Sequence, residues 1–141
     1  MSAKTTSAET FLLSTAALAN LTFMESSVVL LLKTYGTAKI LVAAINKQQQ
    51  SHQSNQIKKN LVKKPLSVSI YIQDQVAAVL ANMAANVDCR SDVVKNGGLP
   101  LLLQFLMAES PATNTDLKPE DYAQIAATER VLQKSAIAIS R

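Results

Sequence analysis

Residues 17–21 read ALANL, residues 79–83 read VLANM, and residues 138–141 read AISR. Each segment starts with apolar residues and has a polar residue, Asn20, Asn82 or Arg141, at its fourth position. The first and second of these polar residues are separated by nearly the same interval as the second and third. Helices that recur at a long, regular interval are typical of α-solenoids, in which stacked units share one continuous core. The segment therefore predicts a helical repeat protein with an extended binding surface.

A second feature repeats with the first. Gly36 precedes an apolar stretch at 40–42, and Gly97 precedes another at 101–103. The interval between the two glycines is close to the spacing of the repeated segment. Because glycine allows backbone conformations that other residues avoid, we expect a sharp bend between two helices at each position. Two separate features that shift together favour a true repeat over a chance likeness of alanine-rich helices.

The composition agrees with an all-α fold. Hydrophobic residues make up 48% of the 141 residues, tryptophan is absent, and there are only three glycines and four prolines. No long stretch alternates apolar and polar residues with the period of two that a half-buried strand requires. The length favours a single domain. We therefore predict one α-solenoid region over residues 1–141.

The region divides into three parts. The first is the last helix of one unit, over about residues 7–23, with Thr6 as its N-cap. A full unit covers about 25–86, with a polar insert at about 48–66, and a partial unit covers about 89–141, with an insert at about 109–119. Further helices are expected over about 26–34, 37–47, 69–86 and 90–96, and one more from Pro119 onward.

Charge and chemistry exclude several classes of function. The formal charge of +4 is mild, and aromatic residues are only 4% of the chain, so we expect no nucleic-acid partner. Cys89 and His52 are the sole residues of their kinds, and neither has metal ligands at a useful spacing. No nucleophile–base pair, carboxylate pair or phosphate loop is evident. We therefore expect no enzyme, metal or cofactor. The single cysteine favours a cytoplasmic location.

The repeats resemble those of the armadillo family, most clearly in GGLPLLL at residues 97–103 and in VLANM at residues 79–83. The resemblance implies a right-handed superhelix, here a partial array, whose long third helices line a concave groove. In that family the asparagine that ends the phrase faces the groove and hydrogen-bonds the backbone of an extended peptide. A primary amide suits this role because it both donates and accepts hydrogen bonds. Carried over by position, the candidate groove residues are Asn20, Gln75, Asn82, Lys134 and Arg141.

The sequence also departs from one branch of that family. Nuclear-import adaptors place tryptophan four residues before the asparagine, whereas this chain has Ala16 and Ala78 there. The groove charges are basic, at Lys134 and Arg141, and not acidic. Charge complementarity therefore favours an acidic protein partner over a basic nuclear signal.

A narrower resemblance covers residues 16–23, 73–83 and 127–138, which are similar to the armadillo region of the Inscuteable adaptors. It implies a role in cell polarity, spindle orientation and asymmetric cell division, at the cell cortex as well as in the cytoplasm. In that family the adaptor joins the Par polarity complex to the spindle-orienting protein Pins, and Pins binding is associated with a region N-terminal to the array.

Two alternatives stay open. The chain could be a generic armadillo scaffold of a cytoskeletal or trafficking adaptor that binds through its convex side or its loops. A weaker alternative is contact with an anionic membrane through a basic cluster before Pro65, formed by Lys58, Lys59, Lys63 and Lys64.

We also expect the array to continue past residue 141, with an apolar face exposed over residues 137–141.

Overall fold

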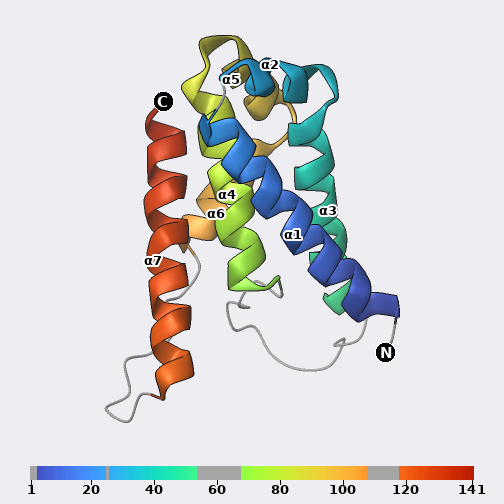
Figure 1. Cartoon of the computed structure of the whole chain (residues 1–141), viewed down its shortest axis with the longest axis vertical. Helices are drawn as coiled ribbons and strands as arrows, with labels where there is room; N and C mark the ends of the chain where they lie inside the picture. The colour runs from blue at the N-terminus through green and yellow to red at the C-terminus, as the bar shows by residue number, and fades with distance from the viewer. Residues whose placement is uncertain (1–2, 25, 54–67, 108–117) are drawn as a thin grey trace.

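The computed structural model describes residues 3–24, 26–53, 68–107 and 118–141, and this part of the chain consists of helices and short connections (Figure 1). The first three helices are α1 (Ala3–Met24), α2 (Ser26–Thr34) and α3 (Thr37–Gln53). They are followed by α4 (Ile70–Ala85), α5 (Val87–Lys95), α6 (Gly98–Met107) and α7 (Pro119–Ser140). The prediction of an all-α fold is confirmed for these residues.

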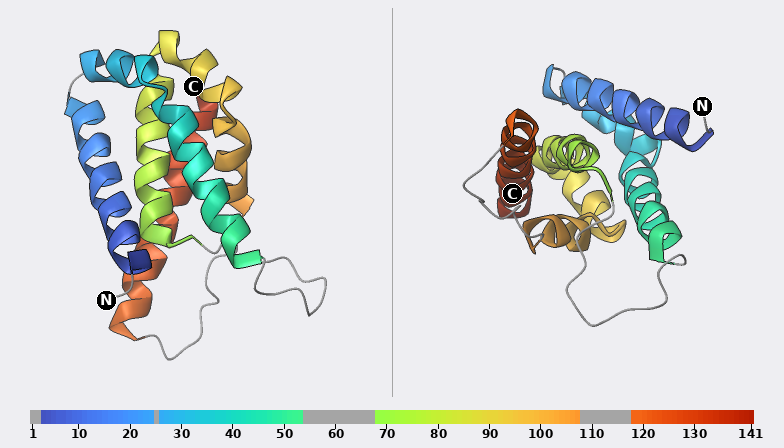
Figure 2. Two further views of the ribbon diagram at one scale, coloured as in Figure 1. Left: turned by 90° about the vertical axis from the view of Figure 1, so that its right-hand side faces the viewer. Right: turned by 90° about the horizontal axis from the view of Figure 1, so that it is seen from below.

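The helices lie in two layers. The long helices α1, α4 and α7 run side by side in one layer, and α4 lies between the other two (Figure 1). Helices α3 and α6 form the second layer behind them, as the view along the helices shows (Figure 2). The short helices α2 and α5 cross one end of the molecule and contact each other there. Segments that are one repeat apart in the sequence are thus neighbours across the first layer.

The core is continuous through α4. One side of this helix is completely buried, and its apolar side chains at that face include Val76, Val79, Leu80 and Met83. The same buried cluster also contains Leu41 and Ile45 of α3 and Leu102 and Phe105 of α6. Burying such side chains contributes roughly 1.5–3 kcal/mol each. This face holds the two layers together, and it leaves the opposite face of α4 open between α1 and α7.

Both predicted glycine bends are present. Gly36 has φ of 66° and Gly97 has φ of 81°, a left-handed conformation that glycine adopts without steric cost. Each glycine separates a short helix from the helix that follows it. The bends therefore turn the chain from the end of the molecule, where α2 and α5 lie, into the second layer.

Side-chain caps fix where two of the helices begin. At the start of α4, the Ser69 side chain accepts a hydrogen bond from Tyr71 N. At the start of α5, the Asn86 side chain accepts one from Asp88 N. Each cap satisfies a backbone N–H that has no partner within the first turn of its helix.

Three predicted boundaries are wrong. Helix α1 begins at Ala3, so Thr6 lies inside it and does not hold the N-cap position. Helix α3 continues to Gln53, so the first part of the expected polar insert is helical. Glutamine is a good helix former, and polarity alone does not end a helix. Helix α5 begins at Val87, earlier than expected, because the asparagine before it supplies the cap.

Two predicted features lie outside the described residues. They are most of each polar insert and the basic cluster of Lys58, Lys59, Lys63 and Lys64. Among the described helices, no single one is long and apolar enough to cross a membrane. Ser27–Thr34 and Thr37–Gln50 reach that length and apolarity only together, across a bend of 64°.

Candidate functional site: a groove between α1, α4 and α7

An open groove of about 550 Å³ runs along the first layer of helices. The floor is the strip of α4 that lies between α1 and α7, and the walls come from the C-terminal half of α1 and from α7. Its lining residues are Ala19, Asn20, Phe23, Asp74, Gln75, Ala78, Ala81, Asn82, Arg130, Lys134, Ile137 and Arg141. The groove exists because the three long helices lie side by side with only small alanines at the centre of the floor.

The five residues singled out from the sequence all line this groove: Asn20, Gln75, Asn82, Lys134 and Arg141. The repeat period brings them together, because it places equivalent turns of α1, α4 and α7 next to each other. That they bind a peptide remains a prediction. The two alanines in place of tryptophan differ in position: Ala78 lies on the floor, whereas Ala16 is not among the lining residues.

Asp74 is the most constrained charge in the groove. Its residue is only 3% exposed. One carboxylate oxygen accepts from Lys134 Nζ at 2.6 Å, and the other lies 3.1 Å from Arg130 Nε. A buried carboxylate without such partners would be strongly destabilising, so the two cations of α7 allow Asp74 to occupy this position on α4. The three residues also tie α7 to α4.

Asn82 holds α4 against α1. Its amide nitrogen donates to Ala19 O at 3.2 Å and to Thr22 Oγ1 at 2.9 Å. Both donors are therefore used within the protein, and only the amide oxygen remains to accept a hydrogen bond from a ligand. The expected double role of this asparagine, as donor and acceptor to one peptide, does not fit this geometry.

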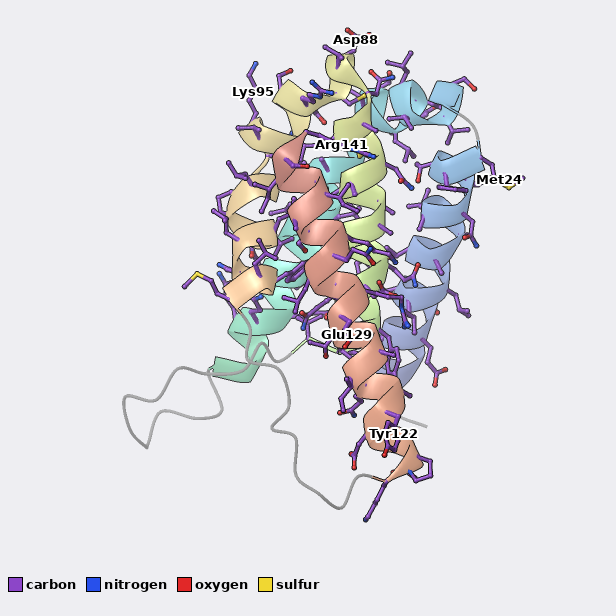
Figure 3. All side chains as sticks on the ribbon, turned by 90° about the vertical axis from the view of Figure 1, so that its left-hand side faces the viewer. Met24, Asp88, Lys95, Tyr122, Glu129 and Arg141 are labelled. Atoms are coloured by element: carbon purple, nitrogen blue, oxygen red, sulfur yellow. The ribbon has the colours of Figure 1, made fainter. Side chains whose placement is uncertain are left out.

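Arg141 makes the equivalent contact one unit later. Its Nη1 donates to Ala81 O at 3.2 Å, and Ala81 occupies the same position in the repeat as Ala19. The side chain lies at the end of α7 beside α4, while Tyr122 marks the opposite end of the same helix (Figure 3). The guanidinium keeps further N–H groups for a ligand at this end of the groove. Arg141 is thus both an interhelical contact and a cation of the groove.

Asn20 and Gln75 are the free polar groups. Within the described residues, neither side chain has a hydrogen-bond partner, and Asn20 is exposed. Their amides therefore keep all their donors and acceptors for a ligand. Together with the exposed Phe23 and the 40% exposed Ile137, they give the groove a mixed polar and apolar surface.

The sequence-based prediction missed Asp74 and Arg130. A charged residue inside an apolar helix is ordinarily assumed to face solvent. A signal did exist, because Arg130 and Lys134 lie one turn apart on one helix face. Asp74 precedes them by 56 and 60 residues, which is close to one repeat. The repeat period therefore points from this carboxylate to its two partners.

The single cysteine, Cys89, lies outside the groove. Cys89 is completely buried at the junction of α2 and α5, and its Sγ lies 3.7 Å from Val29 O. Burial raises the pKa of the Cys89 thiol above its ordinary value of 9.0. Among the described residues, no group of three or more His, Cys, Asp or Glu side chains is arranged to hold a metal ion.

The chain is similar to proteins of one known family. The sequence model of the family described as Protein inscuteable C-terminal matches residues 1–141. The Protein inscuteable homolog of Homo sapiens is 33% identical over 135 residues, which are 96% of this chain and 19% of the relative. The Mus musculus homolog has the same identity and coverage. The chain therefore spans about a fifth of the length of these curated relatives. No solved structure matches it.

Proposed function

Because this chain belongs to the Protein inscuteable C-terminal family, we propose that it is a non-enzymatic protein-interaction module of an adaptor in asymmetric cell division. The partners would be proteins of cell polarity or spindle orientation, met in the cytoplasm and at the cell cortex. Support comes from the family and from the groove, whose mixed polar and apolar side chains suit recognition of a protein segment.

The proposal includes an armadillo-type solenoid. A short helix, a glycine bend, a second helix and a long helix occur twice, as α2 to α4 and as α5 to α7, and α1 corresponds to the long helix of a preceding unit. Equivalent long helices lie side by side. In this arrangement the single domain would consist of the long helix of one unit followed by two units of three helices each.

The groove would bind an extended, acidic segment of the partner. The observation that carries this proposal is that all five residues expected at the concave surface line one groove. The groove is lined by three cations, Arg130, Lys134 and Arg141, and by a single carboxylate, Asp74, which leaves an excess of two positive charges. Charge complementarity of this kind steers an acidic partner and suppresses basic ones.

A pair of groove substitutions tests the proposal. Asn20→Ala and Gln75→Ala together remove the two amides that make no hydrogen bond within the described residues, so the fold should change little. Asn82 is unsuitable because it also joins α1 to α4. The matched control combines Gln104→Ala and Gln133→Ala, which remove two exposed amides outside the groove.

The test measures how much of each partner protein is recovered with the variants and where it is crosslinked. The full-length protein carrying each pair would be captured from dividing cells, with crosslinks mapped onto the helices and spindle orientation scored in parallel. We expect partners crosslinked to α1, α4 and α7 to be lost from the groove variant and kept by the control. Equal recovery from both variants, with crosslinks on α3, α6 or the inserts, would instead support a scaffold that binds through its convex side.

A further inference from the structure

We propose that the groove recognises two acidic side chains spaced three residues apart on the bound segment, with apolar residues between them. This inference rests on the proposed groove function and specifies its ligand. It follows from how the cations are distributed along α7, from the charge that Asp74 cancels, and from the small side chains between the two positive ends.

The positive charge is divided between two ends of the groove. At one end Arg130 and Lys134 share the carboxylate of Asp74, so one positive charge is left over. The Asp74 side chain is 5% exposed and stays paired with both cations, whereas the Lys134 side chain is 30% exposed and keeps further N–H groups for a ligand. At the other end Arg141 uses one nitrogen for Ala81 O and keeps its charge.

Between the two positive ends, the α7 wall of the groove is apolar. Ile137 lies between Lys134 and Arg141 on the same face of α7, because the three are spaced three and four residues apart. The floor includes Ala78 and Ala81, whose small side chains leave room for a side chain of the ligand. Phe23 contributes an exposed ring from α1.

The spacing selects a conformation and a register. Lys134 and Arg141 are two helical turns apart, which is about 10 Å along a helix. A polyproline-type segment has three residues per turn and rises about 3.1 Å per residue, so its residues i and i+3 point to the same side about 9 Å apart. In a flat β-strand, residues i and i+3 point to opposite sides, and i and i+2 lie only about 7 Å apart. Two acidic side chains three residues apart on a polyproline-type segment can therefore reach Lys134 at one end of the groove and Arg141 at the other.

Isomeric peptides test the spacing without changing the charge. The probe is a fluorescein-labelled octapeptide, Ser-Gly-Glu-Pro-Val-Glu-Ser-Gly, and its isomers place the two glutamates adjacent or two apart. Binding to the 141-residue chain, with its C-terminus amidated so that no terminal carboxylate offsets the Arg141 guanidinium, would be measured by anisotropy at low salt. We expect the three-apart peptide to bind about tenfold more tightly than either isomer, since each end then meets one carboxylate.

Two charge variants locate the effect. Arg141→Gln should abolish the preference for the three-apart peptide, so that all isomers bind with the same weaker affinity. Arg130→Gln should have the same effect, because Asp74 stays paired with Lys134 and no positive charge is left over at that end. Lys39→Gln removes the same charge from α3, outside the groove, and should keep the preference. If a charge variant fails to fold, amide shifts of the wild-type chain with each isomer decide: shifts at Arg130, Lys134 and Arg141 should be largest with the three-apart peptide.

The outcomes separate this inference from the proposed function. If all acidic isomers bind equally and Asn20→Ala with Gln75→Ala weakens them all, the groove binds acidic segments and the spacing rule is wrong. If no acidic isomer binds better than the peptide with both glutamates replaced by glutamine, the acidic groove function fails as well.

Discussion

The polar residues of the second and third repeated segments each join two helices in addition to facing the groove. Asn82 donates to Ala19 O, and Arg141 donates to Ala81 O, so the same contact is made twice, one repeat apart. A hydrogen bond of this kind contributes about 1 kcal/mol. The pattern explains why a polar residue recurs at this position even where asparagine gives way to arginine: either side chain can reach the carbonyl of the preceding long helix.

Asp74→Asn should destabilise the fold by about 1–2 kcal/mol, because it breaks a buried ion pair whose two cations still reach solvent. The substitution leaves Arg130 and Lys134 close together without their shared carboxylate, and it presents an amide donor to them. Solvent around the cations keeps the loss below the roughly 3–5 kcal/mol typical of a fully buried pair. Urea denaturation followed by circular dichroism measures it, and the loss should grow smaller as salt screens the two cations.

The matched control for this prediction is Glu129→Gln. It removes a negative charge from α7 next to Arg130, but Glu129 is exposed and has no ion pair among the described residues. Its urea midpoint should therefore stay close to that of the wild type. Equal midpoints for the wild type and the Asp74→Asn variant would show that the buried carboxylate does not stabilise the contact between α4 and α7.

At the scale of the helices, periodicity and glycine positions predicted most of the helices and both of the bends. The bends at Gly36 and Gly97 and the start of α7 at Pro119 followed from local backbone preferences, which act whatever the tertiary context. The end of α3 was missed because the run of glutamines after Lys47 is polar yet compatible with helix. Composition distinguishes buried from exposed segments better than it distinguishes helix from loop.

Gly98→Ala should be more destabilising than Gly36→Ala, although of these two glycines only Gly36 has a positive φ. A Cβ on Gly98 would lie 2.6 Å from Val93 Cγ1 and 2.8 Å from Val93 O, so α5 and α6 would have to separate, at a cost of about 2 kcal/mol. A Cβ on Gly36 meets nothing within 4 Å and costs only the left-handed strain of about 1 kcal/mol. Thermal denaturation of both variants gives the order, and a lower Tm for Gly36→Ala would contradict this packing of α5 against α6.

At the scale of the whole molecule, α4 serves both stability and the groove. One face of the helix is the centre of the core, and the other is the groove floor between α1 and α7. The repeat period, together with the resemblance to armadillo repeats, indicated which turns would be neighbours, and the five candidate residues chosen in this way line the groove; that they bind a ligand stays a prediction. It did not predict which of their hydrogen-bonding groups are used internally, since that depends on side-chain reach across helices, as for Asn82 and Thr22.

Cys89 offers a probe of opening at the far end of this core. The thiolate is the reactive form of cysteine, and burial of Cys89 raises the pKa of its thiol while removing it from solvent. Lys33 lowers that pKa, and Asp92 and Asp88 raise it, all less than burial does. At pH 8 we expect a disulfide reagent to label the folded chain at least about 100-fold more slowly than the urea-unfolded chain, because labelling requires local opening. Similar rates in both states would mean that the junction of α2 and α5 is open.

The Cys89 thiol should make the free energy of unfolding decrease as the pH rises above about 9. Its pKa is higher in the folded state, so the folded chain holds the proton more tightly. The contribution is complete below the ordinary value of 9.0 and is lost as the pH rises from there toward the folded pKa. Urea midpoints measured from about pH 8 to 10 should therefore decline more steeply for the wild type than for Cys89→Ala, which lacks the titrating group but keeps Lys33, Asp88 and Asp92. Parallel declines in the two proteins would assign the alkaline loss to other groups and show that the thiol is not held protonated by the fold.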